Sequence, residues 1–213
     1  MLPTAPFDLQ HCVKLAPCTP VIGGAAYRFA GSWTPDAVTR FLEQAFGNIR
    51  HSNRIDLHAE GQRSNQPVAL SLHQEDYHLL IRPRLLALLC LENIVTGGET
   101  IVSSLNPESI PEGLRDQRIR FYRRSVGEWT PWRPILEDNG LQLWPRIALP
   151  DVHRVVEVSS GHASFAAWIA RLEADAKLVT WTAGTLLIID NRISIHGRKA
   201  MSGSVRSLMR WVL

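Results

Sequence analysis

The feature that most limits the fold is a series of short apolar or alternating runs, separated by Gly, Pro and Asn. Branched and aromatic residues are common in these runs, and such residues suit a pleated, half-buried surface. Many short strands with few helices favour a sandwich or a jelly roll, because each sheet must bury one face against another layer. The segments expected to be strands are 54–59, 67–73, 85–94, 118–124, 153–158, 177–181, 184–190 and 204–212.

Two segments have helical periodicity instead. Thr34-Pro35 combines an N-cap with a proline at the first helical position, and apolar residues follow at helical spacing, which predicts an amphipathic helix over 35–47. A second apolar stripe predicts a helix over about 162–175, and its members are Phe165, Ile169, Leu172 and Ala176. The expected fold class is mainly β with flanking helices, around a double-stranded β-helix (jelly-roll) core.

Length and composition predict one domain over residues 1–213. The chain has 213 residues, of which 45% are hydrophobic and 20% are charged, an ordinary globular balance. Within it, segment 125–150 carries several prolines and Trp129, Trp132 and Trp144. Loops of that length in a compact domain are usually functional. We expect 125–150 to be a lid or an irregular excursion, whose tryptophans serve mainly in packing.

Charge and cysteine usage limit the partners and the compartment. The net charge is only +3 and the basic residues are scattered, so we expect no nucleic-acid partner. No apolar run reaches the roughly 18–20 residues of a membrane span, so we expect no membrane association. The three cysteines, Cys12, Cys18 and Cys90, are odd in number. With no signal peptide at the N-terminus, they predict reduced thiols in a cytoplasmic protein.

The motif that carries chemistry is His73-Gln74-Glu75. Alternate residues of a strand point to the same face, so His73 and Glu75 can reach one metal ion from one strand end. His196, which follows an apolar strand and a turn, is the candidate third ligand. Two imidazoles and one carboxylate form the facial triad of non-haem iron(II) oxygenases. H-x-E also occurs often by chance, so the motif is weak evidence without its context.

That context resembles the taurine dioxygenase/clavaminate synthase superfamily. The matching motifs are Gly97-Gly98-Glu99-Thr100, the run from Trp181 to Arg192, His196-Gly197-Arg198, and the closing pair Arg206 and Arg210. Thr100 lies 25 residues after Glu75, as in the family pattern. The stretches 73–78, 82–83 and 88–93 are similar to the branch that contains clavaminate synthase and the free arginine and asparagine hydroxylases. The resemblance covers about residues 65–105 and 180–213.

The resemblance implies an Fe(II)/2-oxoglutarate-dependent dioxygenase. His73, Glu75 and His196 would hold Fe(II), and 2-oxoglutarate and dioxygen would be cosubstrates. Thr100 and Arg206 would bind the 5-carboxylate, with Arg210 nearer the 1-carboxylate. The two arginines share a face of one strand because their separation is even. The spacing from His196 leaves open which arginine binds which carboxylate.

The expected reaction oxidises a C–H bond of a small polar metabolite and releases succinate and CO2. An amino acid or its derivative in specialised metabolism is the expected substrate. Hydroxylation, desaturation and cyclisation all remain open. The carboxylate of Glu75 fills the site where a halide would bind in halogenases of this family, so halogenation is not expected. The gap from Thr100 to His196 is shorter than is usual in the family, which implies a reduced lid.

Two other functions use the same residues. A zinc hydrolase could bind its ion with His73, Glu75 and His196, and a non-catalytic jelly-roll binding protein would leave them without a metal. The zinc hydrolase does not explain Thr100 with the arginine pair, and the binding protein predicts that replacing His73 would leave function intact. The sequence does not indicate an oligomeric state. Residues with weaker assignments are Asp76 and His78 (support of the ligand loop), Asp190 and Arg192 (the turn before His196), and Arg63, Asp151 and Glu157 (substrate contacts).

Overall fold

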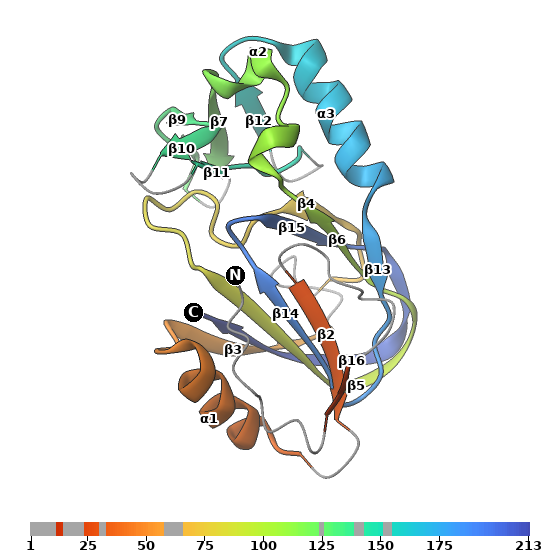
Figure 1. The fold of residues 1–213 in the computed structure, drawn as a ribbon. Helices are drawn as coiled ribbons and strands as arrows, with labels where there is room; N and C mark the ends of the chain where they lie inside the picture. The colour runs from red at the N-terminus through yellow and green to blue at the C-terminus, as the bar shows by residue number, and fades with distance from the viewer. Residues whose placement is uncertain are drawn as a thin grey trace.

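The computed structural model describes residues 12–14, 24–29, 33–57, 66–123, 126–138, 143–150 and 155–213. Two antiparallel sheets form a sandwich in the lower part of Figure 1, and a smaller group of strands and helices lies above it. No helix among the described residues is long and apolar enough to cross a membrane. The predicted fold class, mainly β with flanking helices, is confirmed.

The larger sheet of the sandwich has six antiparallel strands in the order β1-β2-β14-β5-β16-β3. Its centre is formed by three long or fully buried strands, because β14 and β16 both pair with β5. The bounds of its strands are Cys12–Lys14 (β1), Gly24–Phe29 (β2), Thr185–Asp190 (β14), Leu85–Gly97 (β5), Met201–Val212 (β16) and His51–Asp56 (β3).

The smaller sheet has four strands in the order β13-β6-β15-β4. The strands are Lys177–Val179 (β13), Thr100–Ser104 (β6), Ser194–Arg198 (β15) and Leu70–His73 (β4). Both sheets contribute to one buried core, in which Leu86, Leu88 and Leu208 of the larger sheet lie with Val102 and Val179 of the smaller one. Strands β2, β6 and β15 were not among the expected segments.

Helix α1 (Pro35–Phe46) covers the outer face of the larger sheet. The Thr34 hydroxyl accepts a hydrogen bond from the amide of Ala37, so the predicted N-cap is confirmed. The first half of strand β5 is apolar on both faces, because the smaller sheet covers one face and α1 covers the other. Alternate residues from Leu86 face the core between the sheets, whereas those from Leu85 pack under α1.

The upper group is built around β7 (Arg118–Arg123), which pairs with β12 (Val155–Val158) and with short strands on its other side. Its other elements are β8 (Glu128–Trp129), β9 (Arg133–Pro134), β10 (Leu136–Asp138), β11 (Leu143–Pro145), the 3-10 turn Pro107–Ser109, α2 (Glu112–Arg115) and α3 (His162–Ala174). The second expected helix is thus confirmed.

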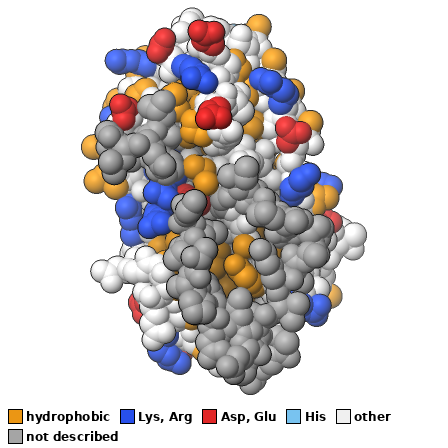
Figure 2. Space-filling model, viewed as in Figure 1, with side chains coloured by type: hydrophobic (Ala, Val, Ile, Leu, Met, Phe, Trp, Pro, Cys, Tyr) orange, Lys and Arg blue, Asp and Glu red, His pale blue; other side chains and the backbone are white. Residues whose placement is uncertain are grey.

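Segment 125–150 is more regular than the sequence suggests. Its described part contains β8 and β9, which pair with β7, and the hairpin of β10 and β11. The sequence did not predict these strands because prolines lie within the segment, but short strands at a sheet edge tolerate proline. A role as a lid stays a prediction, as does the single-domain organisation. In Figure 2 the acidic and basic side chains of the upper group are interspersed.

Candidate active site

A cavity of about 100 Å³ lies within the sandwich. A cavity needs roughly 10–15 Å³ to hold one water, so this cavity has room for a small organic acid. All six predicted site residues line it, and Ile55, Leu57, Leu70, Leu86, Leu88, Gly197, Arg198, Met201 and Leu208 complete its wall. The sequence therefore predicted residues that the fold brings to one place.

Three predicted metal ligands lie at one end of this cavity. His73 ends β4, and its backbone partner across the smaller sheet is His196 of β15. The two imidazole rings have centroids 4.6 Å apart. Glu75 follows β4, and its Oε2 lies 3.9 Å from Nε2 of His196. Two ligand atoms about 2.1 Å from one ion lie roughly 3.0–4.2 Å apart, depending on the angle between them.

Close backbone approach explains the glycine after His196. A Cβ on Gly197 would lie 2.5 Å from the carbonyl oxygen of Leu70. Any larger residue would therefore push β15 away from β4. Gly197 thereby allows His196 and His73 to face each other across neighbouring strands.

The Nδ1 atom of His73 lies 2.8 Å from the carbonyl oxygen of Ser71. A carbonyl oxygen only accepts, so Nδ1 carries the proton in this contact. In the neutral ring the lone pair is then on Nε2. A backbone carbonyl that holds the second ring nitrogen is the usual support of a metal-binding histidine. The tautomer that this contact requires therefore fits a metal ligand.

Arg210 orients the Glu75 carboxylate. Its Nη1 donates to Oε1 of Glu75 at 3.0 Å, and its Nε donates to the side-chain oxygen of Asn53 at 2.8 Å. With Oε1 bonded to the guanidinium, Oε2 is the oxygen on the side of His196. Arg210 thus favours a carboxylate that offers one oxygen to an ion.

As the side chains stand, no group of three or more His, Cys, Asp or Glu residues in the described part of the chain is arranged to hold a metal ion. The three predicted ligands converge, but they must adjust before one ion contacts them all. Their donor set of two imidazoles and one carboxylate suits iron(II). The assignment of His73, Glu75 and His196 as metal ligands stays a prediction.

Arg206 lies at the other end of the cavity and is only 4% exposed. Its Nε has no hydrogen-bond partner in the described part of the chain, and its Nη1 contacts the sulfur of Met201 at 3.4 Å. Burial lowers its pKa to about 10, against the smaller opposing influence of Cys90 and Glu99. No ion pair to Arg206 occurs among the described residues. A buried guanidinium in this state favours an anionic ligand.

Thr100 and Trp181 share the Arg206 end. The guanidinium of Arg206 lies 5.9 Å from the centre of the Trp181 ring. The indole N–H of Trp181 donates to the Thr100 hydroxyl at 3.0 Å. The hydroxyl oxygen accepts in this contact, so its own proton is available for another acceptor. Arg206 and Thr100 together form a donor pair suited to a carboxylate.

The remaining assignments have mixed outcomes. Asp190 accepts from the backbone N–H and side chain of Arg192 at 2.7–3.0 Å, so their role in the turn before His196 is confirmed. Glu157 binds Arg120 in the upper group and does not line the cavity. Trp129 and Trp132 stack against Arg120, as expected for packing residues. Two further candidates, Arg63 and Asp151, lie outside the described residues.

Sequence reasoning missed three site-supporting residues, Gln74, Trp181 and Asn191. Gln74 and Asn191 are completely buried, and Trp181 is 6% exposed. Their polar groups bond to residues that are distant in the sequence, so spacing alone could not identify their partners. The only available signal was their position inside the motifs that contain His73 and Asp190.

No protein-family model matches the sequence, and no curated protein matches it either. Solved structures match over most of the chain. Asparagine oxygenase (AsnO) is 17% identical over 92% of this chain and 74% of its own, with a TM-score of 0.72. The non-haem iron oxygenase OrfP, solved with Fe, succinate and (3S)-hydroxy-L-Arg, is 17% identical over 90% of this chain and 76% of its own, with a TM-score of 0.70.

PvcB from Pseudomonas aeruginosa is 19% identical over 95% of this chain and 75% of its own, with a TM-score of 0.66. It is an Fe, α-ketoglutarate-dependent oxygenase from an isonitrile synthetic pathway. Identities at this level establish a common architecture. The chain therefore has the jelly-roll fold of the non-haem iron, α-ketoglutarate-dependent oxygenases.

Proposed function

We propose that this protein is an Fe(II)/2-oxoglutarate-dependent dioxygenase that oxidises a C–H bond of a small, amino acid-like substrate and releases succinate and CO2. One observation carries the proposal. One cavity has imidazole and carboxylate donors at one end and, at the other, a buried guanidinium that has no ion-pair partner among the described residues. The water activation of a zinc hydrolase does not require such a guanidinium, whereas a dicarboxylate cosubstrate buried in the cavity does.

The roles of the residues follow from the different side chains at the two ends of the cavity. Arg206 and Thr100 would bind the 5-carboxylate of 2-oxoglutarate, because both are buried donors. His73, Glu75 and His196 would hold Fe(II) close to the keto-acid end. Fe(II), when bound, would supply the dioxygen activation that is coupled to decarboxylation of 2-oxoglutarate.

Arg210 would act between these groups. It holds Oε1 of Glu75, and its charge faces the cavity beside the predicted metal ligands. We infer that this charge attracts the 1-carboxylate and also prevents Glu75 from using both oxygens on the ion. The apolar wall, which includes Leu86, Leu88 and Leu208, would exclude water around the cosubstrate.

The substrate class rests on the neighbours. OrfP and asparagine oxygenase were solved with hydroxylated arginine and hydroxylated asparagine. We propose an amino acid or its derivative for this chain as well, and hydroxylation as the first outcome to test. The Glu75 carboxylate favours oxidation over halogenation, because it occupies the place that a halide would need.

The decisive experiment adds Fe(II) and 2-oxoglutarate to the protein without oxygen and records the visible metal-to-ligand charge-transfer band. The proposal predicts a band that needs both additions and disappears when 2-oxoglutarate is replaced by succinate, which has no keto oxygen to chelate the ion. Tight zinc binding without the band would favour the hydrolase. No metal binding at all would favour a non-catalytic protein.

The substrate is then sought by succinate release. The protein is incubated with Fe(II), 2-oxoglutarate, oxygen and single amino acids, and succinate formation is compared with the rate without amino acid. A substrate should accelerate release and appear as a product heavier by one oxygen atom. Chlorinated product in the presence of chloride would contradict the assigned reaction class.

A further inference from the structure

Glu75 lies beyond the end of its strand. Strand β4 ends at His73, so the ladder that holds His73 opposite His196 does not extend to Glu75. The next residue, Asp76, has a φ of 49°, in the left-handed region that non-glycine residues rarely adopt. Asp tolerates this region better than most residues, but the conformation still costs free energy that surrounding contacts must offset. Other groups must therefore fix the backbone of Glu75.

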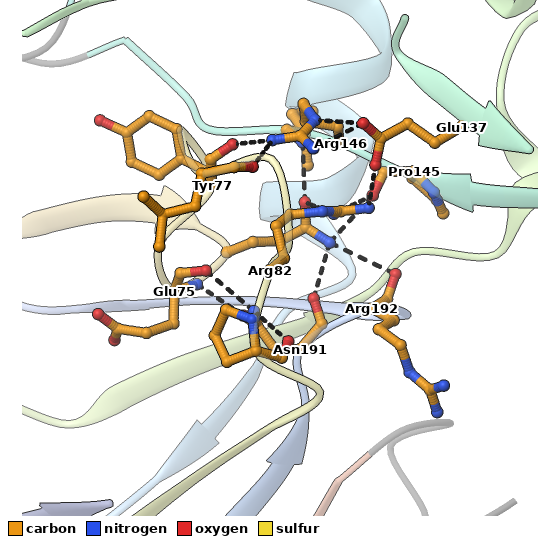
Figure 3. A network of polar contacts seen from close by, with 12 residues as sticks. Glu75, Tyr77, Arg82, Glu137, Pro145, Arg146, Asn191 and Arg192 are labelled. Atoms are coloured by element: carbon orange, nitrogen blue, oxygen red, sulfur yellow. Dashed lines mark hydrogen bonds and ion pairs between the residues drawn. The ribbon is translucent and has the colours of Figure 1, made fainter. Parts of the chain in front are cut away.

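Asn191 provides that support. Its Oδ1 accepts from the backbone N–H of Glu75 at 2.6 Å, and its Nδ2 donates to the carbonyl oxygen of Glu75 at 2.9 Å. Nδ2 also donates to the carbonyl of Pro83 at 3.1 Å. Asn191 is completely buried. Its amide thus replaces a neighbouring strand, because it satisfies both backbone groups of Glu75 (Figure 3).

Gln74, the residue before Glu75, anchors the same segment through its own side chain. The side chain is completely buried, and its Nε2 donates to the carbonyl of Asn191 at 2.8 Å and to that of Pro145 at 3.0 Å. Its Oε1 accepts from Arg82 at 2.7 Å and from the backbone N–H of Ile147 at 2.9 Å. Each polar atom of this amide therefore has a partner, which leaves the side chain a single orientation.

An ion-pair network extends these contacts to the upper group. Glu137 on β10 binds Arg82 at 2.8 Å and Arg146 at 2.6 Å, as Figure 3 shows. Arg146 also donates to the carbonyls of Tyr77 and Leu79, just after Glu75. Burial lowers the pKa of Arg82 to about 10, and Glu137 opposes this shift. Two buried guanidinium groups thus depend on one partly exposed carboxylate for their charge partner.

We propose that Asn191 is a positioning residue for the metal ligand Glu75. Gln74 and Arg82 keep Asn191 and the segment after His73 in their relative positions. Asn191 also lies between Asp190 and Arg192 in the turn that leads to His196. It therefore links the two chain segments that carry the predicted ligands. This inference rests on the proposed function. It assigns a metal-positioning role to a side chain that does not touch the cavity.

The test measures the affinity of the metal-free protein for Co(II), followed by the visible absorption of the bound ion. Asn191→Ala should weaken Co(II) binding about 10- to 100-fold, the usual cost of losing an outer partner of a metal ligand. The matched control is Asn106→Ala, which removes an amide that caps the 3-10 turn 107–109 away from the cavity. The control should bind Co(II) within about twofold of the unaltered protein.

A second variant applies if Asn191→Ala does not fold. Arg82→Lys keeps a cation near Glu137 but cannot span Glu137, Gln74 and Pro145 together. It should weaken Co(II) binding in the same direction, by less. Its control is Arg120→Lys, in the ion pair with Glu157 outside the cavity. Arg120→Lys should leave Co(II) affinity unchanged.

A purely structural role would give a different result. Folded Asn191→Ala and Arg82→Lys that bind Co(II) as tightly as the unaltered protein, with only a lower unfolding temperature, would overturn the inference. A second readout is the affinity for 2-oxoglutarate at saturating Co(II), which should change little because Arg206 has no contact with the network that contains Asn191. If the unaltered protein binds neither Co(II) nor Fe(II), the proposed function itself fails, and this inference fails with it.

Discussion

The two ends of the cavity are organised differently. At the metal end, each predicted ligand on the β4 side is supported by neighbouring groups, through Ser71 for His73 and through Asn191 and Arg210 for Glu75. At the other end, Arg206 is buried against Met201 and Trp181, without an ion pair among the described residues. One end is held by internal bonds, whereas the charge at the other end is stabilised only weakly, by Cys90 and Glu99.

The difference follows from the chemistry that each end has to perform. Metal ligands must be held in place before the ion arrives, and hydrogen bonds from outside the cavity do this. An anion site gains affinity when its cation has no competing partner, because the ligand then relieves the desolvation of that cation. Loss of Arg206 should therefore raise the free energy of unfolding while it weakens ligand binding, whereas loss of a supporting group at the metal end should lower both.

The largest effect is expected at the metal end. His196→Ala removes an imidazole that the supporting groups cannot replace, so it should abolish succinate release while the protein stays folded. The loss should exceed the roughly 10- to 100-fold cost of removing an outer partner of a ligand. Succinate is measured in the presence of Fe(II) and 2-oxoglutarate, and circular dichroism monitors the fold. Succinate formation at the original rate would exclude His196 as a ligand.

Arg206→Met tests the anion end and should have the next largest effect. Loss of one member of a buried charge pair costs about 2–5 kcal/mol, which is roughly 30- to 5,000-fold in the affinity for 2-oxoglutarate. The same change should raise the free energy of unfolding of the ligand-free protein by about 1 kcal/mol or more, because a buried unpaired charge is removed. Titration of 2-oxoglutarate and urea denaturation measure the two effects.

Arg198→Ala is the matched control for this pair of effects. Arg198 also lines the cavity, but it donates to the backbone carbonyls of Gln66 and Val68. Its removal should lower the free energy of unfolding by about 1–3 kcal/mol, since two carbonyls lose their donor. The affinity for 2-oxoglutarate should change much less than in Arg206→Met. Equal, small effects of both variants on this affinity would refute the role of Arg206.

The dependence on pH should distinguish the two ends further. Burial lowers the pKa of Arg206 to about 10. The ligand-free protein therefore releases this proton at a lower pH than the unfolded chain does. The free-energy cost of burying Arg206 in the folded protein thus decreases as pH rises through about 10. Affinity for 2-oxoglutarate should decrease over the same range, because binding needs the charge. Arg206→Met should lack this decrease, which isothermal titration at pH 8 to pH 11 would measure.

The smallest effect is expected for Trp181→Phe. The ring is kept, but the N–H that donates to Thr100 is lost. One such hydrogen bond contributes about 0.5–1.5 kcal/mol, so the KM for 2-oxoglutarate should rise roughly two- to tenfold. The metal affinity should not change, because Trp181 belongs to the anion end. A change in Co(II) affinity would show that the two ends are more strongly coupled than their contacts indicate.

Sequence reasoning was most successful where the pattern is local. The helices at 35–46 and 162–174 and the long strands β5, β14 and β16 follow from periodicity, and the structure contains them close to the expected bounds. It failed for β6 and β15, because their sequences mix small and polar residues with apolar ones. These strands carry site residues, and their polarity reflects the cavity that they line.

The candidate site shows the same division. The even spacing of Arg206 and Arg210 placed both on one face of β16, and both line the cavity. The spacing could not say which end of the cavity each one occupies. Contacts with Glu75 and with the Trp181 ring, which lie far from β16 in the chain, place Arg210 at the metal end and Arg206 at the other.

The sequence by itself determined which side chains were available for chemistry and which strands could place them on a common face, because these depend on residue type and a period of two. Only the tertiary structure decided that His73 faces His196, that Asn191 takes the place of a strand beside Glu75, and that Arg206 is buried without an ion-pair partner in the described part of the chain. The physical reason is that the pKa of an arginine and the orientation of a carboxylate depend on burial and on partners. Partners more than a hundred residues apart meet only when the sheets close.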